Sequence, residues 1–240
     1  MKNYLYISLL LLICISTNAQ KSAFTKASEV DSIFSPKLTG ELFYENKQYI
    51  GEQFFNKDWA DGDILLSTGE MAYRKSLKYN GLFDELIWLN STNFGVFKLD
   101  KSSIAEFWLR NIVGTDFHFK QINVSETGNL KTQNVFAEVK VEGKFSFFIQ
   151  HKISITGTED RYKNKVLYKF DDIDASPRYY IKLPTNLYLM MTKLRRRTFL
   201  KFFPTKKTVI LKIIKDNHLN VNTESDFAKL IELMNKEVTL

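Results

Sequence analysis

Hydrophobic and polar residues alternate with a period of two over most of the chain from Leu38 onward. This alternation is typical of half-buried antiparallel strands. Turn residues recur at spacings of about ten, as in a meander of neighbouring strands. The clearest example is MAYRKSLKY, in which four apolar side chains would share one face: Met71, Tyr73, Leu77 and Tyr79.

The stretch 135–155, VFAEVKVEGKFSFFIQHKISI, contains two alternating runs on either side of Glu142 and Gly143. Glycine adopts a positive φ without steric cost, and two-residue hairpin turns require that conformation. The pattern therefore predicts a hairpin with Gly143 in its turn, whose second strand continues to Ile155.

At Pro204 the hydrophobic period changes to that of a helix. Pro204 or Thr205 suits the first turn of one helix, whose apolar stripe ends at Ile214. Thr223 is a candidate N-cap for a second helix, with Asp226 three residues later. Its apolar residues lie at i, i+3, i+4 and i+7, which defines one face: Phe227, Leu230, Ile231 and Met234.

Many strands followed by two helices predict an α+β fold. We expect predominantly antiparallel β structure, a meander or curved sheet, with two C-terminal helices packed on it. The predicted boundaries are a cleaved signal peptide at 1–19, a loop or short helix at 20–37, a β-rich region at 38–203 and a helical pair at 204–240 in the same domain.

Residues 1–20, MKNYLYISLLLLICISTNAQ, have the pattern of a secretory signal. One early cation precedes an apolar run of 11 residues, which is shorter than the roughly 20 that a spanning helix needs. Thr17 and Ala19 occupy the small-residue positions before a cut at Gln20. Lipidation at Cys14 is disfavoured because the branched Ile13 precedes it. We therefore expect an exported protein, periplasmic or secreted, with peripheral contact to the outer membrane as a further option.

Charge is unevenly distributed along the chain, whose formal net charge is +7. Residues 176–215 contain eleven basic residues and no acidic one. Such polarised charge attracts anions. The densest part, KLRRRTFLKFFPTKK at 193–207, is predicted as a strand as far as Phe203 and then as the start of a helix.

Two interpretations of this basic stretch remain open. Cations on an edge strand prevent edge-to-edge aggregation, so the stretch could be a protected sheet edge. Alternatively, the start of the helix and the strand before it could form an anion site, because helix N-termini and arginine side chains bind anions. The candidate anion-binding residues are Arg195, Arg197, Thr205, Lys206 and Lys207.

Candidate catalytic chemistry is sparse. No GxSxG, HExxH, CxxC, GxxxxGK or GxGxxG motif occurs, so the sequence predicts no catalytic residue, no metal site and no cofactor. His151 is a weak alternative polar site because it shares a strand face with apolar neighbours, where an imidazole needs hydrogen-bond partners. The favoured interpretation is that a bulge or bend near Gln150 turns His151 outward, or that a backbone carbonyl satisfies it. The aspartates around Gly62 are interpreted as a turn at Asp61 and Gly62, with a weak cation site as the alternative.

The segment from Gly40 to Leu89 resembles a group of small, uncharacterised exported proteins of Bacteroidota. The similar features are a Tyr/Phe-rich start, a Trp followed by x-x-Gly-x-Ile at 59–64, and LKYN followed by DEL at 77–86. The hairpin around Gly143 and the paired terminal helices are similar as well. The resemblance implies a β-rich envelope or secreted protein, and it assigns no catalytic residue.

These observations lead to three functional expectations, in order. The first is a non-enzymatic envelope binding or assembly protein whose basic surface contacts anionic lipid head groups or envelope polysaccharide. The second is a periplasmic carrier of an apolar ligand or lipid in a cavity of the curved sheet. The third is a hydrolase that uses His151. Nucleic acid is not an expected partner, because an exported protein does not normally meet it.

Overall fold

The structure is a computed structural model and describes residues 36–45, 49–125, 132–163 and 165–237. The predicted signal peptide and nearly all of the predicted 20–37 segment lie outside these residues. Contacts divide the chain into two units, 1–37 and 38–240, and every element described below belongs to the second unit.

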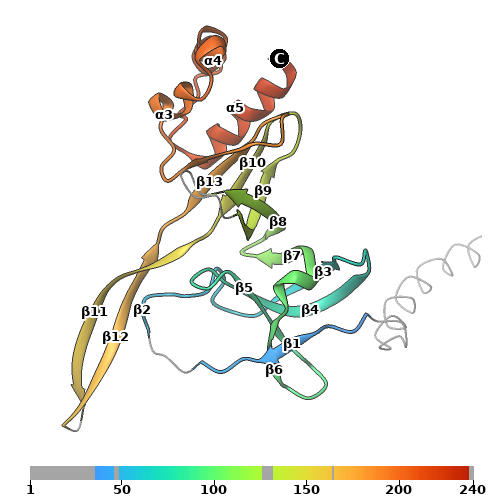
Figure 1. The fold of residues 1–240 in the computed structure, drawn as a ribbon, viewed down its shortest axis with the longest axis vertical. Coiled ribbons are helices and arrows are strands. Elements are labelled where there is room, and N and C mark those ends of the chain that lie inside the picture. Colours follow the sequence, from blue (N-terminus) through green and yellow to red (C-terminus); the bar gives the residue numbers. More distant parts are fainter. Residues whose placement is uncertain (1–35, 46–48, 126–131, 164, 238–240) are drawn as a thin grey trace, which may run out of the picture. The chain divides into compact units, whose positions relative to one another are not determined.

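Eleven strands form one antiparallel sheet (Figure 1). Most neighbours in the sheet are also neighbours in the sequence, so the predicted meander is confirmed. In sheet order the strands are β1 (Gly40–Leu42), β6 (Val96–Leu99), β5 (Glu85–Leu89), β4 (Met71–Asn80), β3 (Ala60–Leu66), β7 (Ile104–Ile112), β8 (Thr115–Ser125), β9 (Thr132–Val141), β10 (Ser146–Gln150), β13 (Arg178–Lys182) and β14 (Tyr188–Met191).

A second, smaller sheet consists mainly of a long two-stranded ribbon, β11 (Ile153–Lys163) and β12 (Val166–Ala175). The short strand β2 (Tyr49–Ile50) pairs with β12 at Asp171 and Asp172 in parallel orientation. The prediction of one strand from Phe145 to Ile155 is therefore wrong. The chain leaves the large sheet after Gln150 and enters the ribbon at Ile153.

The β9–β10 hairpin forms where the alternation predicts it, but the role of Gly143 differs. Gly143 does not have a positive φ, and among the described glycines Gly51, Gly69 and Gly114 do. A Cβ on Gly143 would lie 2.5 Å from the amide nitrogen of Asn235. Glycine is required here because a helix packs against the turn, and not because of the conformation of the turn.

Apolar side chains form three clusters. One lies between β10, β13 and the C-terminal helices and includes Phe147, Ile181 and Phe227. The second lies within the meander around the fully buried Tyr79 and Phe107. The third is smaller and contains side chains of β8, β9, β10 and β13 that alternate with those of the other two: Ile122, Val124, Val135, Ala137, Phe148 and Tyr180.

The helices begin earlier in the chain than predicted. A short helix, α3 (Arg196–Lys201), precedes the 3-10 turn η3 (Pro204–Lys206), α4 (Lys207–Asp216) and α5 (Glu224–Glu237). A 3-10 turn, η2 (Lys101–Ser103), precedes β7. The predicted strand up to Phe203 is therefore wrong, and the predicted boundary at 203/204 lies too late. Two helices were expected at the C-terminal end, where the described residues from Arg196 to Glu237 form three α-helices.

The physical reason is tertiary packing. A short apolar run fits a strand or a helix equally well when it is read alone. Phe199, Leu200 and Phe203 are buried in the cluster that covers β10 and β13, and their spacing fits one face of a helix.

The second predicted helix, observed as α5, is confirmed, including its cap: the Thr223 hydroxyl accepts from the amide of Asp226 at 3.3 Å.

Candidate functional site

The basic segment, defined here as residues 193–215, runs through α3, η3 and α4. Most of its apolar side chains are buried in the cluster between the helices and the sheet, and its cations face outward. Eight of these cations are exposed, and none makes an ion pair with another described residue: Lys193, Arg195, Arg196, Arg197, Lys201, Lys207, Lys212 and Lys215. The segment is thus an amphipathic surface of one charge sign.

The five predicted anion-binding residues lie on consecutive helical segments of the basic segment. Arg195 is the N-cap of α3 and Arg197 lies within that helix. Thr205 and Lys206 belong to η3, and Lys207 is the first residue of α4. All are exposed except Lys206, which is partly buried and has an interaction partner. No side chain caps the start of α4.

The alternative interpretation, a protected edge strand, does not apply to these residues. The strand at this edge of the large sheet is β14, which ends at Met191 before the basic segment begins. The cations from Arg195 to Lys201 therefore do not line an unpaired row of strand amides.

His151 lies at the break between β10 and β11 and contacts a buried carboxylate. Its Nε2 is 2.7 Å from Oε2 of Glu138, a residue with 4 % exposure. The other oxygen of Glu138 accepts from Nζ of Lys140 at 2.7 Å. The ring of His151 also lies 4.4 Å from that of Phe55. The predicted polar position is thus satisfied by a carboxylate that the sequence did not single out.

The electrostatics of Glu138 follow from these two partners. Burial by itself raises the pKa of a carboxyl, but the hydrogen bonds and charges of His151 and Lys140 outweigh it and lower the pKa of Glu138. The group is therefore a buried carboxylate held ionised by its neighbours. In the described residues the ring of His151 makes no hydrogen bond to a hydroxyl group that could act as a nucleophile.

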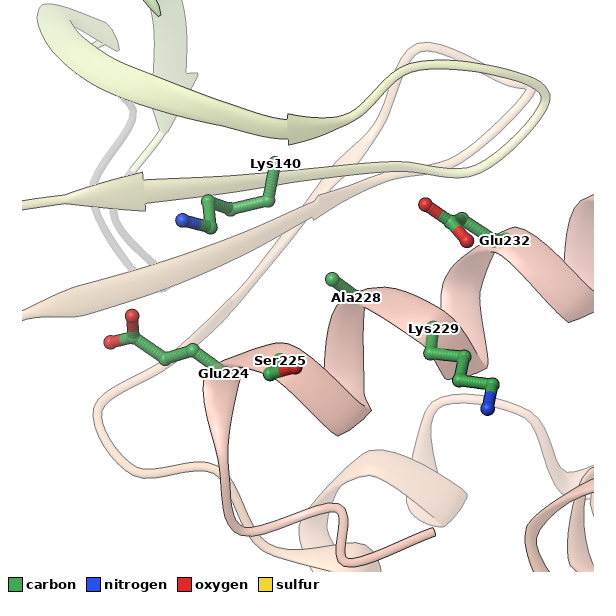
Figure 2. Close-up of a pocket in the computed structure, with 6 residues that line it drawn as sticks. All are labelled: Lys140, Glu224, Ser225, Ala228, Lys229 and Glu232. Carbon is green, nitrogen blue, oxygen red and sulfur yellow. The ribbon is translucent and has the colours of Figure 1, made fainter. Parts of the chain in front are cut away.

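An open groove of about 640 Å³ lies between β9 and α5. Figure 2 shows Lys140 on the strand facing a row of side chains along the helix. The lining is mostly charged, with one alanine: Lys140, Glu224, Ser225, Ala228, Lys229 and Glu232. Close by, the hydroxyl of Tyr179 donates to Glu224 at 3.2 Å. Burial and this carboxylate raise the pKa of Tyr179 to about 12.

The apolar face expected to form a carrier's cavity is covered where the helices lie on it. Side chains of α3, α4 and α5 pack with those of β10 and β13 in one buried cluster. The groove beside α5 is lined mostly by charged residues and is open to solvent, so it is not an enclosed cavity.

The LKYN and DEL residues have a structural role that the sequence did not reveal. Asp84 lies in the turn after β4 and accepts from the hydroxyl of the fully buried Tyr79 at 2.7 Å. It also pairs with Lys101 and accepts from the amide of Phe136 at 3.2 Å. The Asn80 side chain caps the same turn by accepting from the amide of Leu82. The motif therefore holds the turn after β4 against neighbouring strands of the meander.

The acidic residues around Gly62 also differ from the prediction. They belong to strand β3, so no turn forms at Asp61 and Gly62. Asp63 is buried and accepts from Nη2 of Arg110 at 2.5 Å. A guanidinium thus neutralises this buried aspartate. In the described part of the chain no group of three or more potential ligands could hold a metal ion.

The chain matches no protein-family model, no curated protein and no solved structure. Its resemblance to exported proteins of Bacteroidota stays a prediction. None of the helices in the described residues is long and apolar enough to cross a membrane.

Proposed function

We propose that this chain is an exported, non-enzymatic binding protein of the cell envelope. Its basic segment would contact an anionic envelope component, either phosphorylated lipid head groups or acidic polysaccharide. The observation that carries the proposal is the eight exposed cations of residues 193–215, which lack ion-pair partners in the described structure.

The arrangement of the cations supports this proposal physically. Like charges on one surface repel each other, which disfavours the compact state unless a counter-charge is present. The same clustering gives a positive potential that attracts and orients anions. Arginine adds flat, fork-shaped donors that match phosphate and carboxylate oxygens, and three of the eight cations are consecutive arginines, Arg195 to Arg197.

Two further features favour a binding protein over the other expected functions. Helices cover the apolar face of β10 and β13, which disfavours a lipid cavity there. His151 is held by a buried carboxylate and an aromatic ring, an arrangement that satisfies the imidazole without a substrate. Export is supported by the signal-like pattern of residues 1–20.

The experiment compares two quadruple variants with the same change in charge. The first carries Arg195→Gln, Arg197→Gln, Lys201→Gln and Lys207→Gln, which keep helix propensity. The control neutralises four exposed cations elsewhere: Lys57, Lys144, Lys229 and Lys236. Both proteins, without residues 1–19, are sedimented with anionic vesicles and with acidic envelope glycans, and the salt concentration is varied.

We expect the first variant to bind with about tenfold lower affinity and to lose most of the salt dependence of binding. The control should keep the affinity and the salt dependence of the parent protein, because clustered charge and not net charge attracts the anion. Loss with vesicles alone or glycans alone identifies the partner class. Equal binding by the two variants, or no binding by the parent protein, would reject the proposal.

A further inference from the structure

The ribbon of β11 and β12 ends in a cluster of exposed apolar side chains. Among the described residues no third strand pairs with it beyond Asp171, since β2 pairs only at Asp171 and Asp172. In Figure 1 no other labelled strand or helix of residues 38–240 lies beside this end of the ribbon. Its large apolar residues are exposed by 43 to 76 %: Tyr162, Val166, Leu167 and Tyr168. Scattered exposed apolar residues are normal, but a cluster marks an interaction site.

The apolar side chains occupy both faces of the ribbon. Tyr162 lies opposite Leu167, so these two project from one face. Val166 and Tyr168 alternate with Leu167 and therefore project from the other face. A partner with a flat surface would cover only one face, and would leave the remaining tyrosine in water.

The same end of the ribbon is basic. From Arg161 to Lys169 the sequence contains no acidic residue, and Arg161, Lys165 and Lys169 are exposed. The nearest acidic residues, Glu159 and Asp160, lie further from the end. The Asp160–Lys169 pair is two residues from the Tyr162–Leu167 pair, or about 7 Å along the ribbon. Arg161 pairs with Glu159 at 3.0 Å.

We propose that this end of the ribbon inserts end-on into the interface of a phospholipid bilayer that contains anionic head groups. We call it the ribbon tip and define it by Arg161, Tyr162 and residues 165–169. Tyr162, Val166, Leu167 and Tyr168 enter the boundary between head groups and acyl chains. Lys165 and Lys169 contact the phosphates.

A bilayer fits this tip because it surrounds an inserted element on all sides. Apolar side chains on both faces are then removed from water together. Tyrosine is enriched at membrane interfaces because its ring is apolar and its hydroxyl remains in contact with water. Basic residues near a membrane surface are attracted by anionic lipids. The pairing of the two strands satisfies only the backbone groups that face the partner strand. Insertion to the depth of the head groups leaves the outward-facing backbone groups in contact with water.

The test uses the protein without residues 1–19 and vesicles of equal parts phosphatidylglycerol and phosphatidylcholine. The tip variant carries Tyr162→Thr, Val166→Thr, Leu167→Thr and Tyr168→Thr, because threonine retains strand propensity. The matched control carries threonine at four exposed apolar residues elsewhere, one in β4 and three in loops or turns: Tyr73, Tyr44, Phe83 and Leu187. Circular dichroism checks that each variant is folded.

We expect the tip variant to bind these vesicles about tenfold more weakly than the control. A separate variant, Lys165→Gln with Lys169→Gln, should lose affinity for the anionic vesicles and not for vesicles of phosphatidylcholine alone. A Tyr162→Trp variant shows directly where residue 162 lies relative to the bilayer. The fluorescence that the new tryptophan adds to that of the parent protein should shift to the blue when the protein binds vesicles. Lipids brominated on the acyl chains should quench it.

Three outcomes would overturn the inference. The first is that the tip variant and its control bind vesicles equally well. The second is that the fluorescence added by Tyr162→Trp does not change when the protein binds vesicles. The third is that the parent protein is a dimer in solution and the tip variant is a monomer. The last would show that a second copy of the chain covers the tip. The inference does not depend on the basic segment: neutralising Arg195, Arg197, Lys201 and Lys207 leaves the tip unchanged, so the two proposals fail separately.

Discussion

The side-chain amide of Asn235 hydrogen-bonds both main-chain groups of Phe145, ninety residues earlier in the chain. Its Oδ1 accepts from the Phe145 amide at 2.7 Å, and its Nδ2 donates to the Phe145 carbonyl at 2.9 Å. The amide group thus acts like a neighbouring strand for one residue. It ties the last turns of α5 to the turn between β9 and β10.

Replacing Asn235 by alanine should lower the free energy of unfolding by about 1–3 kcal/mol, because the partly buried amide and carbonyl of Phe145 lose their partners. Lys236→Ala, at the next and exposed position of α5, should change it by less than about 0.5 kcal/mol. Urea unfolding of both variants measures the difference. Equal effects would show that the two hydrogen bonds do not stabilise the hairpin.

Gly143→Ala should be destabilising for a reason that depends on Asn235. The new methyl group would lie 2.5 Å from Nδ2 of Asn235, so the amide must move and lose its hydrogen bonds. We expect Gly143→Ala to lower the free energy of unfolding by about 1–3 kcal/mol in the parent protein and by clearly less in the Asn235→Ala background. Additive costs in the double variant would contradict direct contact and indicate backbone strain at Gly143.

The buried Glu138 should make stability fall in acid. The pKa of this carboxyl in the folded protein lies below its usual value of 4.5, so its contribution is complete above about pH 4.5 and is lost as the pH falls through the folded-state pKa. Glu138→Gln should lower the free energy of unfolding by about 1–3 kcal/mol at neutral pH, because His151 and Lys140 lose a charged acceptor.

The difference between the parent protein and Glu138→Gln should therefore shrink as the pH is lowered below 4.5. Chemical unfolding at a series of pH values measures it. Glu232→Gln, at an exposed position of α5, serves as the control and should change stability by less than about 0.5 kcal/mol. A constant difference across the acid range would mean that Glu138 is not held ionised by its neighbours.

Asp84 should be a large contributor to the stability of the meander. Asp84→Ala removes the acceptor of the buried Tyr79 hydroxyl, the partner of Lys101 and an acceptor for the Phe136 amide. We expect a loss of about 3 kcal/mol or more, and little loss for Asp61→Ala, at an exposed position of β3.

A double-variant cycle isolates the pair. Tyr79→Phe should destabilise the parent by about 1 kcal/mol or more and the Asp84→Ala protein by less, because the hydroxyl then has no carboxylate to lose. Thermal or urea unfolding of the four proteins gives the coupling. Additive effects would rule out a stabilising Tyr79–Asp84 hydrogen bond.

Part of the fold could be predicted because it depends on local periodicity. The strands of the meander follow from period-two alternation, as in Met71–Asn80, and α5 follows from the spacing of Phe227, Leu230, Ile231 and Met234. The sequence allowed a bulge or bend near Gln150, but it could not predict that the chain enters another sheet there. Ile153 continues the apolar pattern of Ile149, but it pairs with β12 in another sheet.

The candidate site was predicted with similar limits. The excess of cations in residues 193–215 is a property of composition, so the sequence alone shows where the basic segment lies. It did not show how the cations are presented, because Arg195 to Phe203 fit a strand and a helix equally well. Nor did it identify Glu138 as the partner of His151, since the two residues meet only through the pairing of β9 with β10.

The sequence by itself determined the strand-rich character, the helical C-terminus and the uneven charge, because these depend on local spacing and composition. Tertiary structure decided that Arg196–Lys201 is helical, that Glu138 is buried beside His151, and that Tyr162 and Leu167 lie exposed at the end of a two-stranded ribbon. The reason is that burial is a property of distant segments. A side chain is covered or exposed according to which elements pack against it, and local periodicity does not specify them.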